Sequence, residues 1–358
     1  MVISQAHFNN KNILNLPRIY KRGPPPRIIL TSNIKKTTKF SLQNKSAYDI
    51  LYNLYINQNL SQTKLGELFN VQSQTVRRWL DRLKIPIKER TDVVSEALIK
   101  YKRTSFSNDL PEKAYLIGLR CGDISVQKHG RHFRAIVTTS HPAMLQLFNN
   151  TFKKYSKINF YSKYHKTRKL YFWCVYVDLD DSFSFLLNKT HIIPTWIMDN
   201  TKFFFAFLSG YFDSEGCIVI YFSKKEKYGS IQWIIKSCDK LILESVVQKL
   251  QSFGFNIKYP KLEKKAETNQ NKYNKNTGFP YKKDYWAIKI CIKSQVFSIL
   301  NKMDLKHEEK IKKYNLSKEL AETNWKNATK RIVVLRNQIK NDTMGFMEIA
   351  RIHYNKTH

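Results

Sequence analysis

The sequence carries LSGYFDSE at residues 208–215, and LIGLRCGD at residues 116–123 repeats its pattern. Both stretches are apolar and end in a carboxylate, Glu215 in the second and Asp123 in the first, 92 residues apart (215 − 123 = 92). Small residues recur every four positions before each acid, on one stripe of a helix: Ala114, Gly118 and Gly122, then Ala206, Gly210 and Ser214. Helices with such stripes pack closely. We therefore expect the two acids to lie side by side and to bind a divalent cation.

This paired pattern resembles that of the LAGLIDADG family of homing endonucleases, whose two motif helices form the domain interface and each deliver one metal-binding acid. The second stretch keeps the family pattern at four positions: Gly210, Asp213, Glu215 and Gly216. The first departs from it at Cys121, where the family often has an acid, and at Ile124, where it often has glycine. The resemblance implies an α+β fold in which two pseudo-symmetric αββαββα repeats form a DNA-binding saddle. Because of Ile124, we expect strain in the turn after Asp123.

The charge of the chain predicts a polyanionic partner. Its 358 residues include 62 Lys and Arg against 28 Asp and Glu, a formal net charge of +34 that favours nucleic acid. A membrane surface is the competing polyanion, but the sequence has no run of about 18 apolar residues. Five cysteines without a CxxC pair indicate neither a disulfide framework nor a zinc module. We therefore expect a protein that is not secreted and that works in the cytoplasm, associated with the nucleoid, or in an organelle.

Three segments precede the first motif helix. Residues 1–45 contain nine Lys or Arg and no acid, which predicts a basic arm that follows phosphates. Residues 46–90 have the apolar periodicity of three helices and resemble the helix-turn-helix of resolvases and transposases, and residues 91–110 form a linker. The third helix would present five side chains to the major groove: Gln72, Gln74, Thr75, Arg77 and Arg78. A helical bundle that contacts only protein is the alternative.

From residue 111 the same order of elements occurs twice, in a first repeat over 111–199 and a second over 200–303. Each repeat has a motif helix, two strands, a helix, two more strands and a last helix. In the second repeat we expect the later strands near 256–259 and 285–292, separated by a Lys- and Asn-rich loop over 260–284. Residues 304–358 form a basic helical extension to which the sequence assigns no role.

The resemblance also implies the chemistry of the site. Asp123 and Glu215 would hold two or three divalent ions, and we expect Mg²⁺ because it prefers hard oxygen ligands and retained waters. The family carries a basic catalytic residue at the end of the last strand of each repeat, where Lys293 falls in the second repeat and Asp178 in the first. Strand side chains expected to contact DNA are Arg134, Lys236 and Lys289. The histidines lack metal-site spacing and no GxxxxGK[ST] loop is present, which disfavours nucleotide-driven chemistry.

These observations predict a monomeric, site-specific endonuclease that cuts both strands of a long double-stranded DNA target and leaves short 3′ overhangs. Two alternatives stay open. An RNA-splicing maturase would keep the same saddle and bind intron RNA, and a transcription regulator would bind DNA without cutting it. Retention of an acid at both positions argues against the regulator, whereas nothing in the sequence excludes a maturase.

Overall fold

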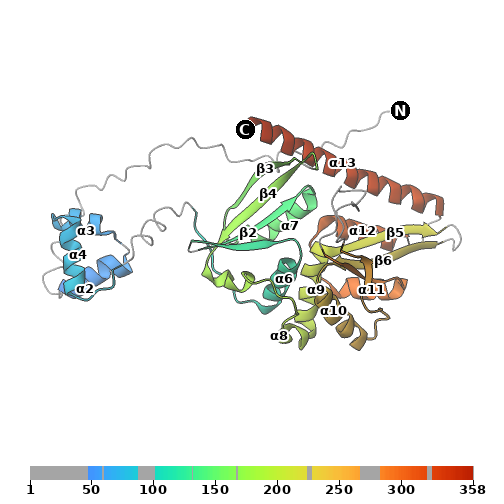
Figure 1. Cartoon of the computed structure of the whole chain (residues 1–358), viewed down its shortest axis with the longest axis horizontal. Coiled ribbons are helices and arrows are strands. Elements are labelled where there is room, and N and C mark those ends of the chain that lie inside the picture. Colours follow the sequence, from blue (N-terminus) through green and yellow to red (C-terminus); the bar gives the residue numbers. More distant parts are fainter. Residues whose placement is uncertain are drawn as a thin grey trace. The chain divides into compact units, whose positions relative to one another are not determined.

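The computed structural model describes residues 47–58, 60–87, 101–130, 132–166, 168–223, 228–266, 283–320 and 325–357. The predicted basic arm over 1–45, residues 91–100 of the linker and residues 267–282 of the Lys- and Asn-rich loop lie outside these ranges. The chain divides into two compact units, residues 1–98 and 99–358, and each is considered by itself (Figure 1). Within the described ranges, no helix is long and apolar enough to span a membrane.

The first unit is a small helical bundle. Its elements are α2 (Ala47–Tyr52), continued by the π-helical segment η1 (Asn53–Asn57), then α3 (Gln62–Phe69) and α4 (Ser73–Arg82). Ser61 caps α3, because its side chain accepts a hydrogen bond from the backbone N–H of Lys64. Leu65, Val76 and Leu80 are fully buried in its core. Helices therefore lie where the periodicity predicts them, and a DNA-reading role for them stays a prediction.

The second unit contains two four-stranded antiparallel sheets, with strand orders β1-β2-β4-β3 and β5-β6-β8-β7. The first repeat consists of α6 (Leu110–Cys121), β1 (Ser125–His129), β2 (His132–Thr139), α7 (Pro142–Phe152), β3 (Ile158–His165), β4 (Leu170–Leu179), the 3₁₀ helix η2 (Asp181–Leu186) and the short α8 (Thr195–Met198). The second consists of α9 (Thr201–Glu215), β5 (Gly216–Ser223), β6 (Tyr228–Ser237), α10 (Lys240–Ser252), β7 (Lys261–Lys264), β8 (Tyr285–Ile290) and α11 (Lys293–Lys302). The predicted α+β class and the repeated element order are confirmed.

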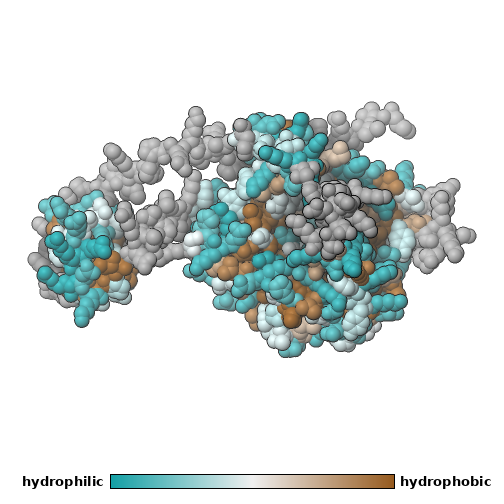
Figure 2. Space-filling model, viewed as in Figure 1, coloured by the Kyte–Doolittle hydropathy of each residue, from teal (hydrophilic) through white to brown (hydrophobic). Residues whose placement is uncertain are grey.

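Each sheet buries one face against helices and turns the other outward. On β2, Phe133, Ala135 and Val137 are buried, while the residues between them are half-buried on the outer face. Trp233 and Ile235 occupy the matching buried positions on β6. The face of the molecule shown in Figure 2 is mainly hydrophilic, with small brown apolar patches, as the alternation of the strands requires.

The two central helices, α6 and α9, pack backbone against backbone. A Cβ atom on Gly118 would lie 2.1 Å from the carbonyl oxygen of Phe207, and one on Gly210 would lie 2.1 Å from the carbonyl oxygen of Tyr115. The two contacts are equivalent, because Gly210 lies 92 residues after Gly118 and Phe207 lies 92 residues after Tyr115, which is also the spacing of the two acids. Glycine is required at both places since any side chain would separate the helices. The small-residue stripes thus produce the close helix pair that the sequence predicts.

Two helices follow the second repeat and pack on the same unit (Figure 1). Helix α12 (Glu308–Glu319) lies beside the end of α9 and against β5. Helix α13 (Trp325–Thr357) contacts both sheets. The indole Nε1 of Trp173 on β4 donates to the carbonyl oxygen of Phe346 at 3.4 Å, and Arg336 donates to that of Ile220 on β5 at 2.9 Å. The predicted basic extension is therefore helical and bridges the two repeats.

Two local expectations are wrong. The strand expected near 256–259 is irregular, and β7 forms instead at Lys261–Lys264, inside the predicted loop. Phe255 and Ile257 are buried by packing rather than by strand pairing, while β7 is an exposed, lysine-rich edge strand. The strain expected after Asp123 is also absent, because Ile124 is not among the described residues with positive φ. Its counterpart Gly216 has an extended backbone, with φ −82° and ψ 156°.

Candidate functional site

The ends of α6 and α9 carry the two predicted acids to one place. Helix α6 ends at Cys121, two residues before Asp123, and α9 ends at Glu215 itself. The helix ends touch, since a Cβ atom on Gly122 would lie 2.2 Å from the Cβ of Ser214 and 3.3 Å from the Cγ of Glu215. The structure therefore brings the Asp123 and Glu215 segments together across the internal repeat.

The two carboxyl groups lie in an environment that disfavours their charged forms. Burial, followed by the charge of Asp123, raises the pKa of Glu215 to about 7. Burial by the surrounding protein also raises the pKa of Asp123, although Lys310, His141 and Lys189 oppose that rise. Two carboxylates that repel each other and are partly removed from water are stabilised by a divalent cation placed between them.

The donor set suits a metal that keeps open coordination positions. Within the described residues, no group of three or more His, Cys, Asp or Glu side chains is arranged to hold a metal ion. Asp123 and Glu215 alone supply two carboxylates, and Mg²⁺ characteristically binds through one or two carboxylates together with water and substrate phosphates. The residues present therefore fit a divalent ion whose remaining ligands come from solvent and from a phosphate.

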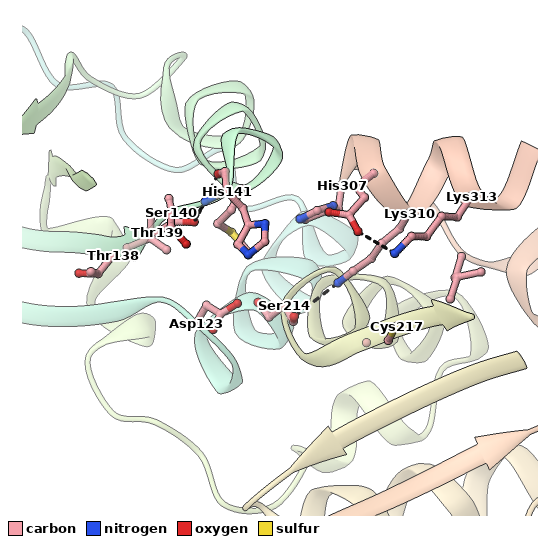
Figure 3. Close-up of a pocket in the computed structure, with 15 residues that line it drawn as sticks. Asp123, Thr138, Thr139, Ser140, His141, Ser214, Cys217, His307, Lys310 and Lys313 are labelled. Atoms are coloured by element: carbon pink, nitrogen blue, oxygen red, sulfur yellow. Dashed lines mark hydrogen bonds and ion pairs between the residues drawn. The ribbon is translucent and has the colours of Figure 1, made fainter. Parts of the chain in front are cut away.

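A cavity of about 300 Å³ opens beside Asp123, between the two repeats (Figure 3). One wall is the turn between β2 and α7, the other is α12, and the floor is the start of β5. Its polar lining consists of Asp123, Thr138, Thr139, Ser140, His141, Ser214, Cys217, His307, Glu309, Lys310 and Lys313. Two lining atoms, the Oγ of Ser214 and the Nδ1 of His307, are buried and have no hydrogen-bond partner among the described residues. The cavity is thus polar and able to hold water or a phosphate group.

Lys310 is a candidate site residue that sequence reasoning missed. It lies on α12 and is 7% exposed, with its ammonium group directed at the end of α9 (Figure 3). Burial lowers its pKa to about 8, although the charges of Asp213 and Asp123 oppose that shift. In the sequence, Lys310 falls on one helical stripe with Tyr314 and Ser317, and the structure buries all three side chains. A lysine within a buried stripe indicates a specific partner.

Asp213, two residues before the acid of α9, is a buried structural carboxylate. It is fully buried and accepts hydrogen bonds from the hydroxyl of Tyr115 at 2.8 Å and from the backbone N–H groups of Lys306 at 2.9 Å and His307 at 3.2 Å. These bonds tie the residues that begin α12 to the centre of the helix pair. Asp213 therefore holds α12 in place and is engaged away from the acid pair.

The Glu215 side of the site contains an ion pair. Lys189, which follows η2 in the first repeat, places its Nζ 2.8 Å from the Oδ2 of Asp239 in the turn before α10. Asp239 holds the position in its repeat that His141 holds in the first. The backbone N–H of each donates to the hydroxyl oxygen of the residue two positions earlier, Ser237 for Asp239 and Thr139 for His141. The two sides therefore differ in charge, with an imidazole near Asp123 and a paired carboxylate near Glu215.

The strand register places Lys293 beyond the level of Glu215. Gly216 pairs with Ile235, which in turn pairs with Ile288 on β8, so the level of Glu215 lies near the middle of that strand. Strand β8 then runs away from this level to Ile290, and Lys293 begins α11 beyond its far end. The register offers no support for a catalytic role of Lys293 at this site.

The other strand residues lie on the outer faces of the sheets. Lys236 is next to the level of Glu215 and forms an ion pair with Glu263 at 2.5 Å. Lys289 is exposed on β8. Arg134 pairs across the sheet with Asp178, with 2.7 Å between Nε and Oδ1. All three cations therefore lie on the outer faces of the sheets, where Arg134 and Lys236 are paired with carboxylates.

The five predicted recognition residues lie on or beside α4 in the first unit. Gln72 precedes the helix, and its side chain is exposed, as are those of Gln74, Arg77 and Arg78. Thr75 is half-buried. The helix thus presents a polar and basic surface opposite the buried Val76 and Leu80, and its target stays a prediction.

Sequence comparison supports the assignment of the second repeat. Residues 202–322 match the family model of the LAGLIDADG-like domain. This segment is similar to LAGLIDADG-like domains. It includes Glu215, Asp213, Lys310 and all of α12. No curated relative matches the chain.

Solved structures similar to this chain are titled as homing endonucleases. Mesophilic variants of the homing endonuclease I-DmoI share 18% identity over 55% of this chain and 92% of that chain, with a TM-score of 0.34. The homing endonuclease I-WcaI bound to its DNA recognition sequence shares 16% identity over 64% and 96%, with a TM-score of 0.36. I-DmoI in complex with DNA and Mn shares 17% identity over 54% and 96%, with a TM-score of 0.33.

Proposed function

We propose that this chain is a site-specific, metal-dependent endonuclease of the homing type that cuts both strands of DNA. One observation carries the proposal: the segments of Asp123 and Glu215 meet at the ends of two closely packed helices that an internal repeat relates, and the charge of Asp123 contributes to the raised pKa of Glu215. A DNA duplex has two antiparallel strands, so a site with internal two-fold character suits cleavage of both. The net charge of +34 supports a nucleic acid partner.

The acid pair would bind the divalent ions, which we expect to be Mg²⁺. When bound, such ions activate a water molecule and stabilise charge on the scissile phosphate and on the leaving 3′ oxygen. The chain itself supplies the two carboxylates, a polar cavity for water, and His141, which lines this cavity and can accept a proton. Two centres acting on opposite strands across the minor groove would leave short 3′ overhangs.

The outer faces of the two sheets would lie on the duplex. Arg134 and Lys236 are held by acidic neighbours, Asp178 and Glu263, which fixes their side chains on those faces. Ordered cations of this kind position a duplex by contacts with its phosphates. One chain supplies both halves, so we propose that it acts as a monomer.

The first unit would extend the recognised sequence. Its helix α4 exposes Gln74, Arg77 and Arg78, residue types that contact base edges and phosphates. Deletion of residues 1–95 should shorten the footprint and reduce the slope of log affinity against log salt, by about one unit for each phosphate group that the shortened chain no longer binds. An unchanged footprint would assign the bundle to protein contact or folding.

The function can be tested without knowledge of the target. The purified chain is incubated with a random-sequence double-stranded DNA library in Mg²⁺, and ends with 3′ overhangs are captured by ligation and sequenced. We expect one recurring long motif, cut on both strands, and no cutting with EDTA. Enrichment of a bound motif without cutting would favour the regulator. Retention of structured RNA in a parallel binding assay, with neither binding nor cutting of DNA, would favour the maturase.

A further inference from the structure

Helix α9 ends in a cluster of backbone carbonyl groups that one lysine side chain satisfies. The Nζ of Lys310 lies 2.5 Å from the carbonyl oxygen of Phe212, 2.6 Å from that of Asp213 and 3.4 Å from that of Ser214. These are three of the last carbonyl groups of the helix, where hydrogen-bond partners within the helix run out, and that of Phe212 also accepts the N–H of Gly216. A cation at this end also interacts favourably with the helix dipole. Lys310 thus caps the turn that ends in Glu215.

The ammonium group is committed to this cap. Its three hydrogens match the three carbonyl contacts, and the residue is 7% exposed, so it has no free donor for a substrate. Burial of a lysine is costly unless each hydrogen finds an acceptor. The buried Lys310 side chain therefore holds the last carbonyl groups of α9 in position beside the acid pair.

The backbone that carries Lys310 is itself anchored to the same helix. Asp213 accepts hydrogen bonds from the N–H groups of Lys306 and His307, immediately before α12. The Oγ of Ser209, one turn earlier on α9, accepts the N–H of Asp304 at 3.0 Å. The start of α12 is therefore attached along α9 by short bonds, and Lys310 is the last of these attachments before Glu215.

We propose that Lys310 is the positioning residue of the acid pair, fixing the last turn of α9 and with it the carboxylate of Glu215. This inference rests on the proposed endonuclease function, because a displaced carboxylate matters only where it takes part in chemistry. A displacement of about 1 Å at a catalytic group can reduce a rate by roughly a hundredfold. The helix at the corresponding place in the first repeat, α8, is only four residues long, with Ile197 as its buried residue.

The test compares Lys310→Met and Lys310→Arg with a matched control, Lys312→Met, which removes an exposed lysine from the same helix. Lys310→Met should reduce single-turnover cleavage in Mg²⁺ by about a hundredfold while affinity for the selected duplex in Ca²⁺ changes by no more than about threefold. Lys310→Arg keeps the charge and several donors and should recover about tenfold of the rate. Lys312→Met should behave as the unchanged chain does. Cleavage by Lys310→Met within about threefold of the unchanged chain overturns the proposal.

A second measurement is independent of nuclease activity. Hydrogen exchange of the Gly216 amide, which bonds to the carbonyl oxygen of Phe212, reports on the last turn of α9. We expect this exchange to accelerate by about tenfold or more in Lys310→Met, with amides in the middle of α9 unchanged. Acceleration throughout the helix, or none, contradicts the cap. If the unchanged chain cuts no DNA, the proposed function fails, and hydrogen exchange still decides whether Lys310 holds the helix end.

Discussion

The two repeats share the packing of their central helices but differ at the ends of those helices. Gly118 and Gly210 make the same backbone contact in opposite directions. Beyond them, the second repeat buries Asp213 where the first has Cys121, and the polar contacts around these two residues differ as well. The repeats therefore diverge in groups of residues that have changed together. Within each repeat, the hydrogen bonds and packing of such a group fit one another.

The first such group surrounds Asp213. Its hydrogen-bond donors are the Tyr115 hydroxyl and the backbone N–H groups of Lys306 and His307. His307 is the N-cap of α12. In the first repeat, Phe207 stands where Tyr115 would be and has no hydroxyl, and the N-cap of α8 is Pro194, which has no N–H. An acid at position 121 would lack two of the three donors that Asp213 has, so the buried Cys121 is the compatible residue.

The second group explains the residue after each acid. A Cβ atom on Gly216 would lie 2.2 Å from the ring of Phe212, which stacks on Trp233. In the first repeat Arg120 replaces this ring, and its Nε donates to the carbonyl oxygen of Leu186 at 2.9 Å. Because residue 120 has no aromatic ring, the space next to position 124 is open to the side chain of Ile124. The glycine of the second repeat is required by packing and not by backbone conformation.

The shared part of the comparison predicts the largest loss of stability. Gly118→Ala and Gly210→Ala should each destabilise the protein by about 3 kcal/mol, because the added methyl group overlaps backbone atoms of the opposite helix. Gly345→Ala in α13 is the matched control, since nothing lies within 4 Å of its Cβ position. That substitution should stabilise the protein by up to about 1 kcal/mol. Denaturant unfolding of the three variants would reject the close helix contact if all shifts were equal.

The first group of differences predicts a smaller, repairable effect. Cys121→Asp should destabilise the protein by about 2 kcal/mol, because it buries a carboxyl group without two of the donors that Asp213 has. Adding Phe207→Tyr should restore about 1 kcal/mol by supplying the missing hydroxyl. Phe207→Tyr alone should be neutral or destabilising. Unfolding free energies of the double-mutant cycle provide the measurement, and strict additivity of the two changes would refute the idea that these residues changed together.

The smallest expected effect concerns pH in the metal-free protein. Burial and Asp123 raise the pKa of Glu215 to about 7, above its unfolded value, so its contribution to stability is greatest in acid and declines as pH rises through about 7. The variant Glu215→Gln should match the unchanged chain in melting temperature near pH ~5 and exceed it by a few degrees near pH ~8. Mn²⁺ should raise the melting temperature of the unchanged chain at the higher pH. A difference that is constant with pH would contradict this environment for Glu215.

The sequence could predict the features that local spacing encodes. The small-residue stripes and the two acids recur in register, so the helix pair and its α+β setting follow from pattern alone. The role of Lys310 could not be predicted, because its acceptors, at 212 to 214, lie almost a hundred residues away and are backbone atoms. Strand β7 was missed for a related reason: an exposed, lysine-rich edge has no apolar alternation.

The central claim is that the carboxylates of Asp123 and Glu215 act as a pair in cutting DNA. Its most direct test is a strand-labelled cleavage time course on the selected duplex for Glu215→Gln, Asp123→Asn and the control Glu308→Gln, whose carboxylate pairs with Lys312 on the surface of α12. Gel shifts in Ca²⁺ measure binding in parallel. We expect both site variants to lose double-strand cleavage by about 1,000-fold or more and to bind within about tenfold of the unchanged chain. Glu308→Gln should stay fully active. Full cleavage by Glu215→Gln would contradict the central claim.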